Sequence, residues 1–436
     1  MTISLTIRNA QVVLPRSIQR TDISVIDGKI NAIGHSIPEV GEVLDAEGLI
    51  LLPGIVDPQV HFREPGSEYK EDLHSGSCAA AAGGVTSFLD MPNNNPPVIT
   101  RKSMTEKKKL AAEKSVVNYG FFIGATPENL TELNSVENVC GIKIFMGSST
   151  GNLLVDNPKI LEKIFSTGSR LIAVHAEDEA LLRENKELLK HFSDVSLHSR
   201  IRDESVALKA TKRAVGFSLK YQRRLHILHL TTEDECELLR SLPRENLISA
   251  EVCPQHFTMT VPECYKQLGT LAQMNPPIRT KRHAEALWRA LKDGIIDCIA
   301  TDHAPHTLEE KNKPYGIAPS GMPGVETSLA LMLDRVNRND CTLQEVVFWM
   351  SESPANLYNM KGKGRIEVGM DADLVLVDLK LKKTIRNGQL HTKVNWSPFD
   401  GIELQGWPVR TFVNGHTVFM NGKVDRSVRG KEICFT

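Results

Sequence analysis

Long apolar runs, an excess of one charge and closely spaced cysteines are all missing from this sequence. No stretch approaches the roughly 20 consecutive apolar residues of a membrane span, and the N-terminus lacks the basic and apolar blocks of a signal peptide. Lys and Arg total 52 against 53 Asp and Glu, so no overall field draws the protein to nucleic acid or to membranes. These absences predict a cytoplasmic protein that acts on a small molecule.

Cysteine pairs of the C-x-x-C type are also absent, although the 436 residues include 8 cysteines. Scattered cysteines, several of them within apolar stretches, predict buried free thiols in a reducing compartment. The basic run from Lys107 to Lys109 is typical of the solvated face of a helix, and phosphate or nucleic-acid binding is the weaker interpretation.

Both ends of the chain show the alternation of apolar and polar residues that predicts short antiparallel strands. Residues 3–52 carry turn signals at Asp27-Gly28 and Glu47-Gly48, and residues 411–419 predict a hairpin around Asn414-Gly415. We therefore expect residues 1–53 and 363–436 to build one small composite β domain together.

Between these ends, short apolar runs alternate with helical patterns, which predicts βα repeats and a parallel sheet. The expected strands span residues 54–62, 85–91, 116–124, 140–147, 171–176, 224–231, 248–254 and 295–301. Helical patterns intervene, for example at 101–114, 177–191, 203–221 and 281–293. Eight strands close a barrel, so residues 54–362 are expected to form a (β/α)8 TIM barrel.

Polar side chains gather where these strands end, which is where barrel enzymes build their active sites. The first strand ends in Gln59, His61 and Arg63. The later strands end in or carry Asn93, Lys143, His175, His229, Asp302 and His306. A lone histidine in an apolar run is usually a core residue, but several histidines, an aspartate and a lysine at one barrel mouth predict a metal-dependent catalytic site.

Two of these residues leave alternatives open. Side chains 59 and 61 project to one face of a strand, yet Gln59 offers a neutral amide where zinc sites usually have imidazole, which either disables or retunes the site. Lys143 lies within an apolar run, where an ammonium is costly to bury. It is either an ion-paired or snorkelling lysine, or a neutral amine that takes up carbon dioxide and becomes a metal-bridging carbamate.

Seven motifs along the chain form a specific combination. They are Asp57-x-Gln59-x-His61-Phe62-Arg63-Glu64-Pro65-Gly66, Met91-Pro92-Asn93, Gly141-Ile142-Lys143, Val174-His175-Ala176-Glu177-Asp178, Leu228-His229, Asn275-Pro276-Pro277-Ile278-Arg279 and Asp302-His303-Ala304-Pro305-His306. Their combination resembles the class I-like dihydroorotases of the amidohydrolase superfamily over nearly the whole chain. The resemblance implies a zinc-dependent cyclic amidohydrolase that cyclises N-carbamoyl-L-aspartate reversibly to L-dihydroorotate in pyrimidine biosynthesis, with a metal-activated water attacking the ring amide.

The resemblance also implies roles for individual residues. The expected metal ligands are His61, Lys143 as N6-carboxylysine, His175, His229 and Asp302, with Gln59 where the family usually has a histidine. Asp302 is the expected general base as well. The expected substrate contacts are Arg63, Asn93 and His306 to the carboxylate, Asn275 to the pyrimidine ring, and the loop 318–326 through its backbone. Since His175 and His229 form the intact half of the ligand set, we expect one tightly held zinc there and a second position that is weak or empty.

Two other functions fit parts of the pattern. Hydantoinases and allantoinases are similar in barrel and metal pattern, but their substrates lack the carboxylate that Arg63 is suited to grip. A non-catalytic scaffold for another pyrimidine enzyme would explain Gln59, but it would not explain why the other polar residues occur together. We also expect a homo-oligomer, with aspartate carbamoyltransferase as the candidate protein partner.

Overall fold

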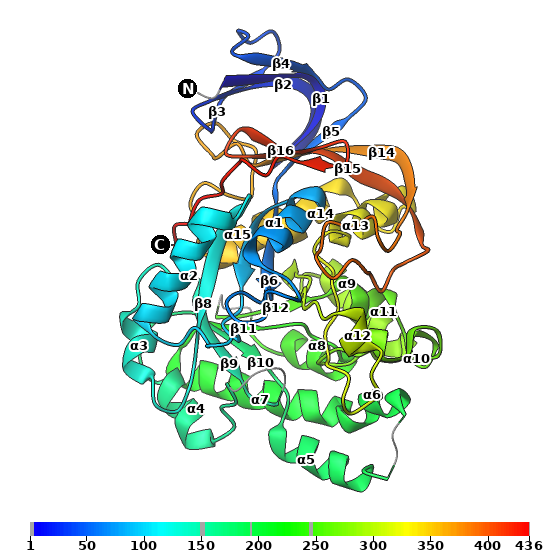
Figure 1. The fold of residues 1–436 in the computed structure, drawn as a ribbon. Coiled ribbons are helices and arrows are strands. Elements are labelled where there is room, and N and C mark those ends of the chain that lie inside the picture. The colour runs from blue at the N-terminus through cyan, green and yellow to red at the C-terminus, as the bar shows by residue number, and fades with distance from the viewer. Residues whose placement is uncertain (1–3, 149–152, 192–193, 244–246, 436) are drawn as a thin grey trace.

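The computed structural model describes residues 4–148, 153–191, 194–243 and 247–435. Its strands form an eight-stranded parallel sheet and a separate nine-stranded sheet. Figure 1 shows the nine-stranded sheet at the top of the view, above the parallel sheet and its helices. The nine-stranded sheet corresponds to the alternating apolar and polar residues at the two ends of the chain, and the parallel sheet corresponds to the βα repeats between them.

The parallel sheet has the eight strands that the sequence predicts. They are β6 (Ile55–Val60), β7 (Val85–Asp90), β8 (Asn118–Gly124), β9 (Gly141–Phe145), β10 (Ile172–His175), β11 (Leu225–Ile227), β12 (Ile248–Val252) and β13 (Cys298–Ile299). They follow one another in chain order across the sheet, and a single parallel bridge between Val60 and His303 links its two edges. The predicted (β/α)8 barrel is confirmed.

Helices connect and cover these strands (Figure 1). They are α1 (Leu73–Ala82), α2 (Arg101–Lys114), α3 (Leu130–Ser135), α4 (Pro158–Phe165), α5 (Glu179–Leu188), α6 (His198–Ile201), α7 (Glu204–Tyr221), α8 (Glu233–Arg240), α9 (Pro254–Thr258), α10 (Glu263–Leu268), α11 (Lys281–Lys292), α12 (Leu308–Lys311), α13 (Ser328–Asn337), α14 (Leu343–Val347) and α15 (Ser353–Leu357), with short helical turns at Val195–Leu197, Gly269–Ala272 and Phe348–Glu352. The four helices predicted from periodicity correspond to α2, α5, α7 and α11.

The second sheet takes strands from both ends of the chain. They are β1 (Ser4–Leu14), β2 (Ser17–Ile26), β3 (Lys29–Gly34), β4 (Glu42–Asp45), β5 (Ile50–Pro53), β14 (Leu374–Thr384), β15 (Glu403–Val413), β16 (His416–Met420) and β17 (Lys423–Val424). The hairpins at Asp27-Gly28 and Asn414-Gly415 are confirmed, and all four turn residues have positive φ angles. The expectation of only antiparallel strands is wrong, because β4 and β5 both run parallel to β1.

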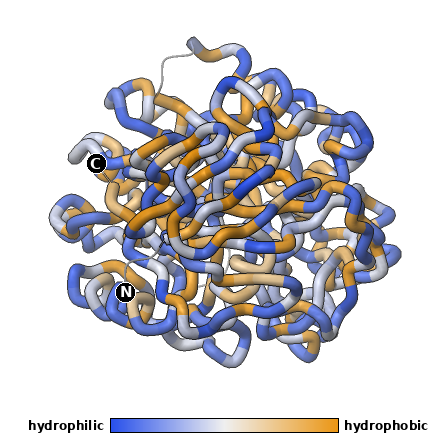
Figure 2. The backbone as a smooth tube through the Cα atoms, turned by 90° about the horizontal axis from the view of Figure 1, so that it is seen from above, coloured by the Kyte–Doolittle hydropathy of each residue, from blue (hydrophilic) through white to orange (hydrophobic). Residues whose placement is uncertain are grey.

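Alternation along the barrel strands decides which side chains face its interior. Ile142 and Ile144 belong to the large hydrophobic cluster between the strands and the helices, so Lys143 between them points into the barrel. Figure 2, a view from the side of the second sheet, shows hydrophobic segments mostly towards the centre of the molecule and hydrophilic segments at its rim. A separate cluster that includes Val56 and Tyr358 fills the barrel floor.

Lys107 contradicts the prediction of a solvated helix face. Its side chain is 1% exposed, and its ammonium lies 2.6 Å from a carboxylate oxygen of Asp90 at the end of β7. Asp90 also accepts a hydrogen bond of 3.0 Å from the backbone N–H of Phe62. The buried ion pair therefore ties α2 to β7 and to the segment after β6, a long-range partnership that helical periodicity does not reveal.

The loop between β14 and β15 and the C-terminal segment both return to the barrel. The Trp396 indole N–H donates to the backbone carbonyl of His306 at 2.8 Å, and Thr392 donates to the buried carboxylate of Glu71. Near the C-terminus, the backbone of Glu432 forms an isolated parallel β-bridge with Tyr119 of β8. The contacts of Trp396 and Thr392 brace the loops at the barrel mouth, and the bridge of Glu432 lies at the opposite end of β8, where that strand begins.

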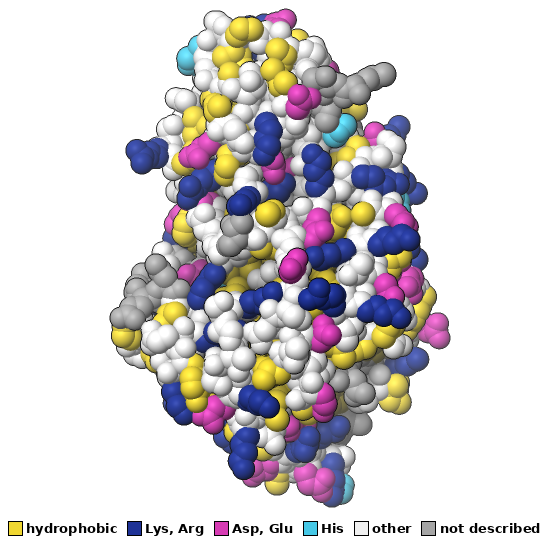
Figure 3. Space-filling model, turned by 90° about the vertical axis from the view of Figure 1, so that its left-hand side faces the viewer, with side chains coloured by type: hydrophobic (Ala, Val, Ile, Leu, Met, Phe, Trp, Pro, Cys, Tyr) yellow, Lys and Arg dark blue, Asp and Glu magenta, His cyan; other side chains and the backbone are white. Residues whose placement is uncertain are grey.

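The surface and the thiols agree with the composition. Seven cysteines are buried, Cys434 is exposed, and all eight are free. Basic and acidic side chains are interspersed over the face that Figure 3 shows. Within the described ranges, no helix combines the length and apolar character needed to cross a membrane.

Candidate metal centre and substrate site

The barrel mouth brings seven of the predicted site residues around one small cavity. Its lining includes Gln59, His61, Lys143, His175, His229 and Asp302, together with Asn275, Ser320 and Gly321. The cavity measures about 20 Å³, which is room for an ion and water but far less than the roughly 300–1,000 Å³ of most ligand pockets. The cavity as it stands is therefore too small to hold a typical ligand.

His175 and His229 form a pair of converging ring nitrogens. Nδ1 of His175 lies 3.1 Å from Nε2 of His229, and both side chains are buried. The other nitrogen of His175, Nε2, lies 2.7 Å from Glu177 and donates its proton there, so Nδ1 presents a lone pair. Two nitrogens about 2.0–2.1 Å from one tetrahedral zinc would lie roughly 3.3 Å apart, so this pair fits a zinc ion.

Glu177 orients His175 from behind. Burial alone would raise the pKa of Glu177, but Arg202 and His175 outweigh it and hold that pKa at about 2. Arg202 is hydrogen-bonded to the same carboxylate oxygen that accepts from His175. A histidine whose second nitrogen donates to a carboxylate is the usual arrangement in protein zinc sites. The sequence motif contains Glu177, but sequence reasoning assigned it no role.

Gln59, His61 and Asp302 form the opposite side of the cavity. One oxygen of Asp302, Oδ1, accepts a hydrogen bond from the Gln59 amide at 3.1 Å and lies 3.1 Å from Nε2 of His61. The amide oxygen of Gln59 is buried without a hydrogen-bond partner among the described residues. Gln59 thus contacts the carboxylate as a donor, whereas a histidine ligand would face a metal with a lone pair.

Asn93 contacts His61 in the structure. Its side-chain oxygen lies 2.7 Å from Nδ1 of His61 and accepts the proton of that nitrogen, which leaves Nε2 of His61 with a lone pair toward Asp302. The predicted contact between Asn93 and a substrate carboxylate stays a prediction.

Lys143 lies buried at the base of the cavity. Its amine stands 4.6 Å from the centre of the Phe145 ring, and no described residue accepts a hydrogen bond from it. Burial lowers the pKa of Lys143 to about 7, although Asp302 and Glu251 act in the opposite direction. A large share of the amine is therefore neutral near pH 7, which is the form that reacts with carbon dioxide.

Three of the site residues have left-handed backbone conformations. The φ angles are 62° at Arg63, 37° at His229 and 47° at Asp302. Such a conformation costs a non-glycine residue roughly 1–3 kcal/mol and is concentrated at functional sites. It also accounts for the early ends of β11 and β13, since the chain leaves the ladder before His229 and Asp302.

Arg63 and His306 lie together beside this cavity. The Arg63 guanidinium donates to the backbone carbonyl of Pro305 at 3.1 Å and lies 3.1 Å from the His306 ring. Lys70 donates to Nδ1 of His306 at 2.9 Å, and Nε2 of His306 donates to the Ser320 carbonyl at 3.1 Å. The result is a basic group of three side chains, of which the sequence predicted Arg63 and His306 but not Lys70.

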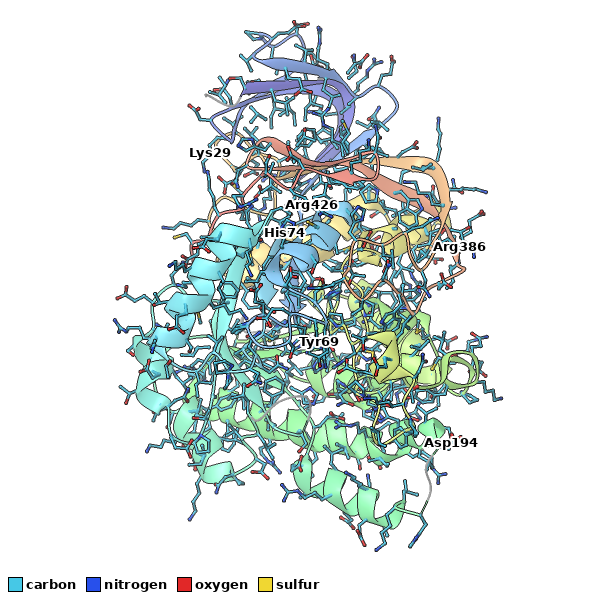
Figure 4. All side chains as sticks on the ribbon, in the orientation of Figure 1. Lys29, Tyr69, His74, Asp194, Arg386 and Arg426 are labelled. Carbon is cyan, nitrogen blue, oxygen red and sulfur yellow. The ribbon has the colours of Figure 1, made fainter. Side chains whose placement is uncertain are left out.

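Further contacts hold the loops that carry these residues. Tyr69, labelled near the middle of Figure 4, donates to Glu310 at 2.9 Å and so joins the loop after β6 to α12. His303 accepts from the backbone N–H groups of Gly324 and Val325 at 3.1 and 3.3 Å, and its other nitrogen faces Glu71 at 3.4 Å. The loop 318–326 is therefore anchored at its C-terminal end.

Asn275 is positioned by a residue that the sequence did not single out. Nε2 of His198 lies 2.9 Å from the Met274 carbonyl and 3.0 Å from the Asn275 side-chain oxygen. Burial first, and Arg202 second, lower the pKa of His198 to about 3, so it is neutral and donates through this nitrogen. His198 belongs to a short helix outside the predicted strand ends, and no pattern in the sequence pointed to it.

Comparison with protein families and curated relatives gives consistent matches. Residues 50–418 match the model of the amidohydrolase family. A protein named dihydroorotase from Methanosarcina acetivorans is 37% identical over 435 residues, which cover 96% of this chain and 92% of the relative. A protein of the same name from Ruminiclostridium cellulolyticum is 35% identical over 418 residues, which cover 91% of this chain and 94% of the relative.

Solved structures with the same fold carry a different name. An L-hydantoinase (dihydropyrimidinase) from Arthrobacter aurescens superposes with a TM-score of 0.94 at 30% identity, covering 99% of both chains. A dihydropyrimidinase from Brevibacillus agri superposes with a TM-score of 0.91 at 27% identity over the same share of both chains. The barrel and the second sheet are thus shared with proteins named hydantoinase and dihydropyrimidinase.

Proposed function

Because the chain belongs to the amidohydrolase family, we propose that it acts as a dihydroorotase, which interconverts N-carbamoyl-L-aspartate and L-dihydroorotate. The small-molecule chemistry follows from the cavity and the family, and the names of the curated relatives support this substrate. One feature of the site carries the proposal. It is the basic group of Arg63, His306 and Lys70, which lies beside the cavity that contains His175 and His229.

Arg63 is the residue that favours dihydroorotate over the substrates of hydantoinases. A guanidinium grips a carboxylate through two parallel hydrogen bonds, and dihydroorotate has a carboxylate where dihydrouracil has none. Arg63 is 8% exposed, and burial lowers its pKa to about 10, so it stays cationic near neutral pH. A buried cation beside the cavity is costly unless an anion joins it, and the substrate carboxylate meets that need.

The proposed metal is zinc, held by His175 and His229, with Lys143 as a carbamate and His61 and Asp302 on the opposite side. The converging ring nitrogens of His175 and His229 support it, because two such nitrogens approach this closely only when a cation or a proton lies between them. When bound, zinc acidifies a water and polarises an amide carbonyl. The amide of Gln59 makes the opposite side a poor second zinc position.

The chain's own residues supply the remaining chemistry. Asp302 removes the proton from the attacking water and delivers it to the ring nitrogen that leaves, acting first as base and then as acid. Arg63 and His306 hold the substrate carboxylate, which fixes the ring amide against the base. Asn275, held by His198, contacts the ring. Homo-oligomerisation and an association with aspartate carbamoyltransferase stay predictions from the sequence.

Turnover of three substrates by the zinc-loaded protein tests this function. We expect hydrolysis of L-dihydroorotate, which is measured as a loss of its ultraviolet absorbance. We expect little activity on dihydrouracil or hydantoin. Faster turnover of the two uncharged rings would favour the hydantoinase alternative. A protein that holds no zinc and turns over none of the three would favour the non-catalytic scaffold.

A further inference from the structure

A second cluster of metal-ligand side chains lies deeper inside the barrel. His226 of β11, Glu251 of β12 and Cys298 of β13 place their ligand atoms within 4.8 Å of one another, and all three residues are 0% exposed. Cys298 precedes Asp302 by four residues, so the cluster lies on the order of 10 Å from the candidate metal centre, toward the N-terminal ends of the strands.

Strand register brings the three side chains to one face. In the parallel ladders, Glu251 pairs with Cys298, and His226 pairs with Ser249. Ser249 and Glu251 are two residues apart and share a face of β12. The His226 ring also packs edge-on against Tyr358, which belongs to the cluster on the barrel floor, so this face is the barrel interior.

The protons around His226 leave a place for a cation. The Ser249 hydroxyl donates to the Leu225 carbonyl at 3.3 Å and therefore accepts from Nδ1 of His226 at 2.9 Å. Nε2 of a neutral His226 then carries a lone pair, yet it faces a carboxylate oxygen of Glu251 at 3.0 Å. Two lone pairs at this distance require either a proton or a metal ion between them.

Other atoms of the cluster favour a metal ion over a proton. The second oxygen of Glu251, Oε1, and the Tyr358 hydroxyl are buried without a hydrogen-bond partner in the described part of the chain. Burial, with Glu251 and Cys298 nearby, raises the pKa of Tyr358 well above its usual range, so its hydroxyl is neutral. A proton shared with His226 would engage only one oxygen of Glu251 and would leave the Cys298 thiol without a role. A metal ion would engage His226, Glu251 and Cys298 together.

We propose that His226, Glu251 and Cys298 form a structural metal site for a divalent ion of the zinc type. One imidazole nitrogen, one thiolate sulfur and one carboxylate oxygen suit zinc. The Cys298 thiol releases its proton to solvent when the ion binds, and the thiolate and the carboxylate then balance the two positive charges.

Such an ion would cross-link the weakest part of the barrel. β11 has 3 residues, β12 has 5 and β13 has 2, and the closure between β13 and β6 is a bridge and not a ladder. One ion bound by all three strands joins them through side chains where the backbone ladder is short. This role does not depend on the proposed dihydroorotase activity.

Cobalt substitution tests the site without an activity assay. The cluster is sealed from solvent, so the protein is produced in zinc-depleted, cobalt-supplemented medium, which supplies the ion while the barrel folds. A cobalt ion bound by a thiolate has a sulfur-to-metal charge-transfer absorption in the near ultraviolet. The candidate metal centre offers only nitrogen and oxygen ligands, so this absorption reports on the cluster alone.

We expect the charge-transfer band in the unmodified protein, together with one bound metal more than in Cys298→Ser. The band should vanish in Cys298→Ser and weaken in Glu251→Gln. It should persist in the control Cys236→Ser, which alters a buried cysteine of α8 outside the cluster. If either cluster variant fails to fold, the unmodified protein still decides the question.

Absence of the band from the folded, cobalt-grown unmodified protein would overturn the proposal and leave a proton shared by His226 and Glu251. A band that survives Cys298→Ser would overturn it as well.

Discussion

The side-chain amide of Gln59 donates a hydrogen bond to Asp302 across the barrel mouth at 3.1 Å. The bond occupies the same carboxylate oxygen that faces Nε2 of His61. The residue that stands in the place of a zinc ligand is therefore a hydrogen-bond donor to the proposed general base. Position 59 thus contributes a hydrogen bond to the site in place of a metal ligand.

Replacing Gln59 with histidine should increase the zinc content. The imidazole adds a nitrogen ligand next to His61 and Asp302, so the second zinc position should fill at concentrations that leave it empty in the unmodified protein. Elemental analysis after a chelator wash measures the change. Gln59→Leu is the control, because it removes the same donor but offers no ligand, and its zinc content should not rise.

A protein that keeps Gln59 can refute this account. Two zinc equivalents per chain after the chelator wash, with Cys298 replaced by Ser so that the deeper cluster does not contribute, would mean that the amide is an adequate ligand.

Asp302→Asn should abolish turnover while the fold and the zinc on His175 and His229 remain. The amide fills the same space but cannot carry the proton between the water and the ring nitrogen, and general acid–base catalysis contributes about 10²–10⁴-fold. Steady-state kinetics on dihydroorotate give the rate. Activity within about tenfold of the unmodified enzyme would assign the general base to another group.

Arg63→Lys should weaken dihydroorotate binding while zinc content stays constant. The ammonium replaces a two-pronged donor with a point charge, and each charge-assisted hydrogen bond lost costs about 1.5–3 kcal/mol. The increase in KM therefore corresponds to about tenfold or more. An unchanged KM would remove Arg63 from the carboxylate site.

The barrel was predictable from the sequence because its signals are local. Alternating runs, turn dipeptides and polar residues after each run led to eight strands and to six of the residues around the cavity. Backbone strain was not predictable, since the left-handed φ angles of His229 and Asp302 result from tertiary packing.

Supporting residues were the main omission. Glu177, Lys70 and His198 act through partners distant in sequence or through a neighbouring side chain. Glu177 lies within a motif that gave it no role, and the surroundings of Lys70 and His198 in the chain carry no distinctive pattern. Lys107 illustrates the reverse error, because its helical position suggested solvent while its partner Asp90 lies on another element.

Glu177→Gln should loosen zinc without unfolding the protein. The amide preserves the shape, but it no longer presents a full negative charge to His175 or to Arg202. Loss of such a carboxylate partner typically weakens metal binding by about 10–100-fold. Competition with a zinc chelator measures the affinity. Glu179→Gln is the matched control two residues away, since Glu179 pairs with Arg183 and the Ser148 backbone, and equal loss in both variants would refute the specific role.

The reaction of Lys143 with carbon dioxide should follow the protonation of its amine. Burial lowers the pKa of Lys143 to about 7, so the amine is mostly protonated and unreactive below that pH and mostly neutral above it. Carbamate formation joins the neutral nitrogen to the carbon of carbon dioxide and releases one proton. Reactivation of metal-stripped, decarboxylated protein by zinc and a fixed concentration of dissolved carbon dioxide should therefore be about tenfold faster at about pH 8 than at about pH 6 and then level off. Carbon-13 NMR of the carbamate carbon follows the same step directly. An ordinary lysine would instead give a rate that continues to rise about tenfold per pH unit beyond pH 8, and that profile, or a carbamate signal that persists in Lys143→Ala, would contradict the assignment.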